Sequence, residues 1–217
     1  MDVAQEKRLA ALAAAELVED GMTVGLGTGS TVALFLPALA ARRLTLRCVA
    51  TSNATEEQAR ALGLAVEPFT GAGSLGRLDV AVDGADQVAP DGWLVKGGGG
   101  AHTREKIVAA SAERFVVVVS SDKLVDTLRS PVPLELHAYG LATTLRRLDL
   151  VSLRDVPPSP DGGVIADYHG DVGDPAALAA ALAGAPGVVD HGLFPPSLVS
   201  EILVGRGDGV GRIVLPR

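Results

Sequence analysis

Three loops of this 217-residue chain combine residue types that bind anions or move protons. The first, Gly27-Thr28-Gly29-Ser30-Thr31, offers backbone N–H groups and three hydroxyls, which suit a phosphate or a carboxylate. The second, Asp83-Gly84-Ala85-Asp86, holds two carboxylates close together in sequence. The third is Lys96 followed by four glycines, whose backbone can approach a ligand closely. These residue types favour the binding of a small anion combined with acid–base chemistry.

Each loop also has a simpler interpretation. The first can be a tight turn that caps a helix. It is not a P-loop, because Gly-Lys-Thr is missing, and it lacks the acid that a dinucleotide fingerprint needs near residues 50–53. The second loop is compatible with an Asx turn, a magnesium site or acid–base catalysis on a sugar, and its residues alone do not distinguish these alternatives.

Glu105 and the lysines are further candidates for chemistry. Thr103 is an expected helix N-cap, which puts Glu105 in the first helical turn, where it can be a base or a surface acid that complements the helix dipole. Only four of the 19 Lys and Arg residues are lysines, so a lysine here suggests a position where a compact ammonium is needed. These lysines are Lys7, Lys96, Lys106 and Lys123.

Alternating helices and strands position these loops. Expected helices are 2–20, 32–41, 56–62, 103–114, 143–148 and 174–184, and expected strands are 22–26, 44–50, 79–82, 93–96 and 115–120, with others near 151, 164, 188, 199 and 213. The run 115–120 has no polar alternation, which is typical of a strand buried on both faces. The pattern predicts an α/β fold with a largely parallel, Rossmann-like sheet flanked by helices, and a smaller α+β second domain. Ligands of such sheets bind at the carboxyl ends of the strands, where these loops fall.

The domain boundary is expected at Pro131-Val132-Pro133, which has the composition of a linker. Residues 1–130 with about 200–217 would then form the catalytic α/β domain. Residues from about 131 to 199 would form the small α+β domain.

Composition excludes several classes of function. The net charge of −7 argues against nucleic acid and anionic membrane surfaces as partners. Residues 21–41 carry no charge and are long enough to span a bilayer, but their glycines and hydroxyls favour a strand, a loop and a helix. The single cysteine, Cys48, excludes an internal disulfide framework and indicates a cytoplasmic location.

Taken in order along the chain, the motifs resemble a known family, ribose-5-phosphate isomerase, type A. The motifs that match are Gly27–Thr31, Asp83–Asp86, Lys96–Gly99 and Thr103–Lys106. The resemblance runs from Lys7 to Leu136 and resumes more weakly at 187–194 and 207–210. It implies interconversion of ribose 5-phosphate and ribulose 5-phosphate through an enediolate, in the non-oxidative pentose phosphate pathway, without a metal or other cofactor.

The resemblance also implies a role for each matching residue. Glu105 would be the general base that moves a proton between C1 and C2. Asp83 and Asp86 would assist ring opening and proton traffic at the sugar oxygens, and Lys96 with the amides after it would stabilise the enediolate oxygen. The implied substrate-binding residues are Lys7, Thr28, Gly29, Ser30, Thr31, Gly84, Ala85, Gly97, Gly98, Gly99 and Lys123. The family is usually a homodimer or homotetramer, so a second copy of the chain is the expected protein partner.

The sequence departs from the family pattern at a few positions. Gln87, Gly100 and His102 replace residues that are common there, but they leave the acid, base and lysine positions intact. The segment 148–163 is rich in proline instead of glycine and basic residues, which could alter domain packing or oligomer contacts.

Two other function classes stay open. One is a sugar-phosphate sensor of a transcription regulator, although we expect the roughly 20 residues before the first strand to be too few for a DNA-binding domain. The other is a different enzyme of the same broad fold, such as an amino-sugar phosphate deaminase or an acyl-CoA transferase.

Overall fold

The computed structural model describes residues 2–215, which form two compact units. Unit 1 contains residues 2–85, 104–123 and 196–215, and unit 2 contains residues 86–103 and 124–195. The predicted fold class is confirmed, because a mostly parallel sheet flanked by helices occurs together with a smaller antiparallel sheet.

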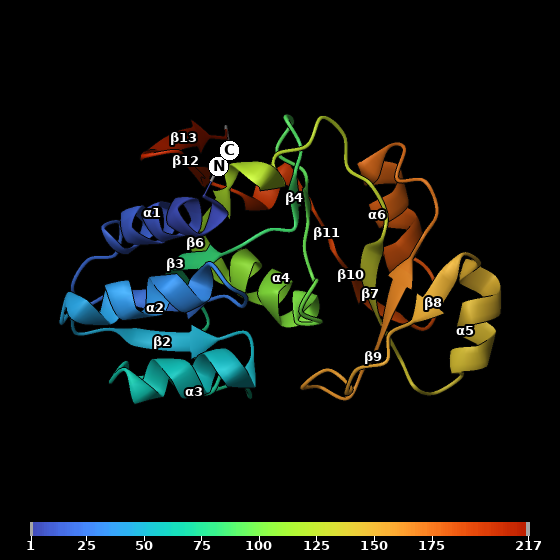
Figure 1. The fold of residues 1–217 in the computed structure, drawn as a ribbon. Coiled ribbons are helices and arrows are strands. Elements are labelled where there is room, and N and C mark those ends of the chain that lie inside the picture. Colours follow the sequence, from blue (N-terminus) through green and yellow to red (C-terminus); the bar gives the residue numbers. More distant parts are fainter. Residues whose placement is uncertain (1, 216–217) are drawn as a thin grey trace. The chain divides into compact units, whose positions relative to one another are not determined.

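Unit 1 is built on a six-stranded sheet in the order β13-β12-β6-β3-β1-β2 (Figure 1). Its strands are β1 (Thr23–Leu26), β2 (Arg47–Ala50), β3 (Leu78–Asp83), β6 (Ala112–Ser120), β12 (Glu201–Arg206) and β13 (Gly209–Val214). All neighbouring strands run parallel except the edge strand β13, which forms an antiparallel hairpin with β12. The long buried stretch of β6 agrees with a strand covered on both faces.

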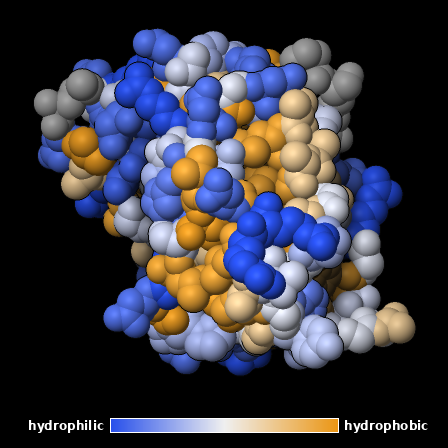
Figure 2. Space-filling view, turned by 90° about the vertical axis from the view of Figure 1, so that its right-hand side faces the viewer, coloured by the Kyte–Doolittle hydropathy of each residue, from blue (hydrophilic) through white to orange (hydrophobic). Residues whose placement is uncertain are grey.

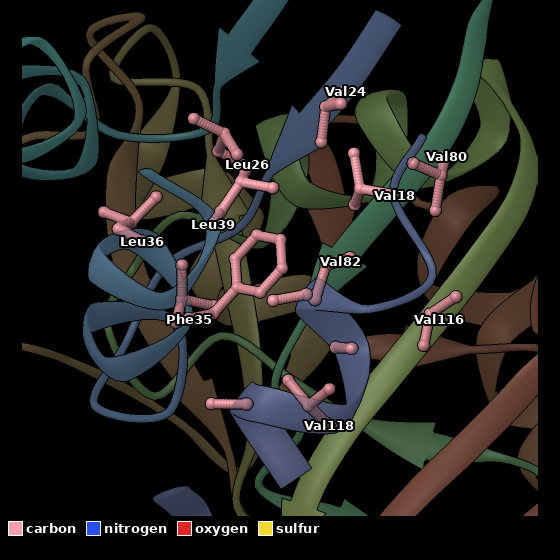
Figure 3. Packing of buried hydrophobic residues seen from close by; sticks show 14 of the residues in the cluster. Val18, Val24, Leu26, Phe35, Leu36, Leu39, Val80, Val82, Val116 and Val118 are labelled. Carbon is pink, nitrogen blue, oxygen red and sulfur yellow. The ribbon is translucent and has the colours of Figure 1, made fainter. Parts of the chain in front are cut away.

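Helices cover both faces of this sheet. They are α1 (Val3–Ala15), α2 (Val32–Ala41), α3 (Asn53–Ala61) and α4 (His102–Ser111), and the 3₁₀ turns are η1 (Ser121–Lys123) and η2 (Pro196–Leu198). Because side chains alternate along a strand, Val24 and Leu26 of β1 face α1 and α2, whereas Gly25 faces α4. Figure 3 shows the first of these two layers, with Phe35 of α2 in the same cluster as Val82 of β3 and Val118 of β6.

Two glycines of unit 1 allow neighbouring elements to come close to the sheet. A Cβ atom on Gly25 would lie 2.4 Å from Cγ1 of Val108, and one on Gly205 would lie 1.9 Å from the backbone oxygen of Glu6. Real Cβ atoms do not make such short contacts. The first glycine therefore lets α4 pack on β1, and the second lets α1 pack on β12.

Unit 2 contains two antiparallel sheets. Its elements are β4 (Gln87–Val88), β5 (Leu94–Val95), β7 (Val132–Leu136), α5 (Leu141–Leu148), β8 (Val151–Leu153), β9 (Val164–Tyr168), α6 (Pro175–Ala183), β10 (Val188–His191) and β11 (Leu193–Phe194). The strand orders are β10-β7-β9-β8 and β11-β5-β4. Leu134 and Leu136 of β7 belong to a separate apolar cluster, which also includes Leu182 of α6.

Several sequence-based boundaries need correction. The first helix ends at Ala15 rather than near 20, and α4 ends at Ser111 because Ala112 already pairs with Leu78 of β3. The linker prediction at 131–133 is wrong, since Val132 begins β7. The sequence predicts residues 86–103 as part of the first domain, but they belong to unit 2, where β5 pairs with β11.

The uncharged stretch 21–41 forms β1, a loop and α2, as its glycines and hydroxyls suggested. None of the helices between residues 2 and 215 has both the length and the apolar character that crossing a membrane requires.

Candidate active site

Asp83 lies against the first glycine-rich loop. It is the last residue of β3, its side chain is buried, and its Oδ1 accepts hydrogen bonds from the backbone N–H groups of Thr28 (3.0 Å) and Gly84 (2.8 Å). A Cβ atom on Gly27 would lie 2.1 Å from the carboxyl carbon of Asp83. Only glycine at position 27 therefore lets this carboxylate reach the loop.

The loop itself is fixed by hydroxyl groups. Thr28 Oγ1 lies 2.7 Å from Thr51 Oγ1, and Thr55 donates a hydrogen bond to the backbone oxygen of Gly27 (2.8 Å). Lys7 Nζ donates to Ser30 Oγ (2.9 Å), so two residues predicted to bind substrate are brought together. An ammonium, several hydroxyls and the N-terminus of α2 form a set of groups that suits a phosphate.

Lys123 is tied to the same end of α1 through Glu6. The fully buried Glu6 carboxylate accepts from Ser121 N–H (2.9 Å), Ser121 Oγ (2.8 Å) and Gly207 N–H (3.1 Å). These bonds, first the one from Gly207 and then those from Ser121, lower the pKa of Glu6. Because Ser121 begins the turn η1 that contains Lys123, Glu6 fixes this turn beside the start of α1, where Lys7 also lies.

Sequence reasoning missed Glu6. A signal was nevertheless present, because residues 6, 10 and 14 share one face of the first helix and the other two are alanines. An acid in line with the apolar face of a helix indicates a buried carboxylate that needs partners.

Glu105 lies at the same edge of the unit 1 sheet as Asp83. Helix α4 leads into β6, whose first residue pairs with the start of β3, so the helix runs opposite to the strands and begins at their carboxyl ends. Val108 packs on Gly25, and Glu105 lies one turn earlier on the same helical face, about 5 Å nearer to these ends. The Glu105 side chain is 4% exposed.

Unit 2 contains Lys96, which directly follows β5. Its side chain is buried, and its ammonium lies 5.4 Å from the centre of the Phe194 ring. Its backbone N–H donates to Gly192 O (2.8 Å). A cation over an aromatic face is stabilised by the ring. The residues around Lys96 in the sequence do not indicate this partner.

Asp86 contacts the glycine loop of unit 2. Its Oδ2 accepts a hydrogen bond from Gly98 N–H (2.8 Å). Gly97 has a φ of +101°, and a Cβ atom there would lie 2.7 Å from Nδ1 of the buried His102, so the position requires glycine. Two of the residues that differ from the family pattern have structural contacts here. His102 packs against Gly97 of the loop, and the side-chain amide of Gln87 donates to the backbone oxygen of Arg129 and accepts from its N–H.

The predicted site residues divide between the two units. Unit 1 contains Lys7, Thr28, Gly29, Ser30, Thr31, Asp83, Gly84, Ala85, Glu105 and Lys123, and unit 2 contains Asp86, Lys96, Gly97, Gly98 and Gly99. Over residues 2–215 the structure has no group of three or more His, Cys, Asp or Glu side chains arranged to hold a metal ion.

Comparison with known proteins decides the family. The sequence profile of ribose 5-phosphate isomerase A (phosphoriboisomerase A) matches residues 47–209. This chain belongs to the ribose 5-phosphate isomerase A family. A relative named ribose-5-phosphate isomerase A from Caulobacter sp. (strain K31) is 45% identical over 229 aligned residues, which cover 99% of this chain and 100% of the relative.

Solved structures of the family have the same fold. The ribose 5-phosphate isomerase A from Methanocaldococcus jannaschii superposes with a TM-score of 0.88 at 33% identity, over 96% of this chain and 97% of the other. A D-ribose-5-phosphate isomerase in complex with phospho-erythronic acid gives a TM-score of 0.91 at 32% identity, over 99% and 100% of the two chains. The family resemblance of the ordered motifs is therefore confirmed.

Substitution of Gly27 by alanine tests how the Asp83 carboxylate is held. The new Cβ atom must displace Asp83, and a shift of about 1 Å at a reacting group can lower turnover about a hundredfold. We expect Gly27→Ala to lower kcat/KM for ribose 5-phosphate by this order. Gly76→Ala is the control, because a Cβ atom there would meet nothing within 4 Å. Equal activity of the two variants would contradict the proposed contact.

Acid titration of stability tests the buried Glu6. Its pKa is lower in the folded chain than the ordinary value of 4.5, so the unfolded chain takes up the proton first as pH falls. The contribution of the carboxylate is complete above about pH 5 and is lost as pH falls from there towards the folded pKa. We expect Glu6→Gln to be less stable at neutral pH, and the difference from the natural chain to shrink as pH falls.

Urea unfolding at a series of pH values measures this effect. The matched control is Glu57→Gln, whose exposed side chain lies on α3. A difference between Glu6→Gln and the natural chain that stays constant with pH would exclude the assigned hydrogen bonds.

Proposed function

We propose that this chain interconverts ribose 5-phosphate and ribulose 5-phosphate through an enediolate, with Glu105 as the base. Family membership makes the chain a ribose 5-phosphate isomerase. The enediolate intermediate and the roles of the individual residues are our proposal. The observation that supports them most is the position of Glu105. This buried acid lies at the carboxyl edge of the sheet, together with Asp83 and the hydroxyl-rich loop.

Phosphate recognition is assigned to unit 1. A sugar phosphate carries a charge of about −1.5 to −2, and the protein has a net charge of −7, so local positive groups must offset repulsion. Lys7, Lys123 and the N-terminus of α2 supply that potential. Thr28, Ser30 and Thr31 add hydroxyl donors, and the bond between Lys7 and Ser30 keeps one cation at the loop.

The chemical step is a proton transfer between neighbouring carbons. In the direction of the ketose, Glu105 removes the proton from C2 of the open-chain aldose, and the electron pair forms the C1–C2 double bond of the enediolate while negative charge moves to the C1 oxygen. A proton then moves from the C2 hydroxyl to the C1 oxygen. The same carboxyl group returns its proton to C1 while the C2–O bond becomes the carbonyl of ribulose 5-phosphate. A positioned base contributes roughly 10²–10⁴ to such a rate.

Charge on the sugar oxygens needs donors and proton carriers. We assign stabilisation of the enediolate oxygen to Lys96 and the amides of the loop that follows it, where one donor contributes about 10²–10³ to kcat. Asp83 and Asp86 take the roles of ring opening and proton traffic at the sugar hydroxyls. The Gly98 amide already donates to Asp86, and we assign the neighbouring Gly99 amide to the substrate.

The ligand of one relative supports this assignment. Phospho-erythronic acid, named with the solved structure above, joins a phosphate to a carboxylate. A carboxylate is a planar group with negative charge on its oxygens, and the enediolate is likewise planar, with negative charge on the oxygens of two neighbouring carbons. The same groups of this chain would therefore bind both.

The state of the only cysteine is consistent with a cytoplasmic location. Cys48 of β2 is fully buried, and this burial raises the pKa of its thiol to about 12. The thiol is protonated at neutral pH, and the fold needs no disulfide, as expected for a reducing compartment.

We also infer that the enzyme is a homo-oligomer. Figure 2 shows apolar residues gathered among polar ones on the face that it presents. In unit 2, β8 is an edge strand, and Leu150 before it, Leu153 at its end and Val156 in the segment after it are all about half exposed. Exposed apolar side chains at an edge strand favour contact with another protein surface.

Light scattering tests self-association. We expect a mass of two or four times 22.1 kDa for the natural chain and a lower mass for Leu150→Glu/Leu153→Glu. Leu12→Glu, at an exposed position of α1, is the control. A monomeric natural chain at micromolar concentration would contradict the inference.

Replacement of the base is the direct test of the mechanism. Glu105→Gln keeps the shape of the side chain but removes its ability to take a proton, so we expect kcat to fall by about 10²–10⁴ while KM changes little. Glu57→Gln is again the control, because Glu57 is exposed on α3. Near-normal turnover of Glu105→Gln would exclude Glu105 as the base.

A further inference from the structure

Hydrogen bonds to Arg154 hold the glycine loop of unit 2. Arg154 Nη1 donates to the backbone oxygens of Gly97 (2.9 Å) and Gly98 (3.0 Å). Beside the loop lies a cavity of about 550 Å³, lined by Gly98–Ala101, Arg154, the prolines of 157–160, Ile165 and Asp167. Because this space is not filled by side chains, packing alone does not fix the loop from this side.

The guanidinium of Arg154 is itself fixed by Asp167. Nε and Nη2 donate to the two carboxylate oxygens of Asp167 at 2.7 and 2.6 Å, and both side chains are largely buried. The pair forms across neighbouring strands, since Asp167 lies on β9 and Arg154 follows β8, with its N–H bonded to Ile165 O. Such a two-pronged ion pair is rigid, so the N–H groups on Nη1 of Arg154 point in fixed directions.

Because Arg154 fixes the two carbonyl groups, it also fixes the N–H groups of the same two peptides. The carbonyl and the N–H of one trans peptide point in opposite directions. In the peptide between Gly97 and Gly98, the carbonyl accepts from Arg154 and the N–H donates to Asp86. In the next peptide, the carbonyl of Gly98 accepts from Arg154, so the N–H of Gly99 points away from the guanidinium.

We propose that Arg154, held by Asp167, is a positioning residue for the isomerisation. It turns the peptide between Gly98 and Gly99 so that the Gly99 amide is directed at the substrate oxygen that gains negative charge. Through the preceding peptide it also fixes the Asp86 carboxylate. The proposal rests on the proposed function, in which this loop stabilises the enediolate.

The test is the steady-state kinetics of Arg154→Ala and Arg154→Lys with ribose 5-phosphate. A misdirected amide weakens binding of the charged transition state more than binding of the substrate. We therefore expect Arg154→Ala to lower kcat about tenfold to a hundredfold, with KM within about threefold of the natural value. Arg154 makes four hydrogen bonds here, two to Asp167 and one to each carbonyl, whereas the single nitrogen of lysine has three N–H donors and cannot make the two-pronged bond, so Arg154→Lys should keep most of the defect. Arg146→Ala, exposed on α5, is the control.

Added guanidinium ion separates positioning from a purely structural role. The cavity opens onto the place of the missing side chain, so millimolar guanidinium should restore part of the kcat of Arg154→Ala and leave the natural chain unchanged. If Arg154→Ala does not fold, Asp167→Asn gives the answer. This variant keeps the arginine but loses the charge that orients it, so kcat should fall in the same direction by a smaller factor.

Clear results would overturn the proposal. Folded Arg154 and Asp167 variants with natural kcat would do so, as would a loss confined to KM or to the melting temperature, or a kcat defect that guanidinium does not relieve. A natural chain that does not convert ribose 5-phosphate would instead contradict the proposed function, and this control is measured first.

Discussion

The absence of side chains at two positions of one short segment determines how the edge of unit 1 that holds Asp83 and Glu105 is built. At Gly25, the missing Cβ lets Val108 of α4 reach β1, and this contact sets how far Glu105 extends past the sheet. At Gly27, the missing Cβ lets the Asp83 carboxylate accept hydrogen bonds from the loop that follows β1. Larger residues at either position would separate a carboxylate from the hydroxyl-rich loop. The positions of the two acids relative to the hydroxyl-rich loop therefore depend on the close approach of the backbone at these two glycines.

Carboxylates that accept hydrogen bonds from backbone amides occur at several places in this chain. Asp83 accepts from Thr28 and Gly84, and Asp86 accepts from Gly98. Asp79 accepts the N–H and hydroxyl of Thr23, and these bonds, first that from the N–H, lower the pKa of Asp79. A carboxylate that accepts several N–H groups fixes a loop without filling space. An acidic protein that binds an anionic sugar phosphate thus uses part of its negative charge internally.

Local patterns in the sequence were sufficient for the fold class and for the main loops. The valine run of β6 and the alternation of strands with helices predicted the parallel sheet, and the hydroxyl loop, the two aspartates and the glycine run predicted the family. Prolines misled the boundary prediction at 131–133. Pro133 is tolerated in β7 because the β10 ladder ends at the pair between His191 and Leu134, so the missing N–H leaves no ladder bond unmade there.

Long-range pairs could not be found in this way. Phe194 lies under Lys96, and Arg154, which follows β8 much later in the chain, reaches Gly97 and Gly98. Neither pair has a local signature, because strand pairing in unit 2 brings its members together. The residues to which we assign the chemistry could thus be identified from the sequence, whereas the residues that fix their positions could not.

The measurement that tests the account most directly is isomerisation in heavy water followed by NMR, with EDTA present. If Glu105 moves the proton through an enediolate, the removed proton can exchange with solvent before it returns. We predict that ribulose 5-phosphate formed early in the reaction contains deuterium at C1, and that Glu105→Gln forms this product far more slowly. Product that forms at the full rate with no deuterium at C1, and with Glu105→Gln as active as the natural chain, would contradict the account.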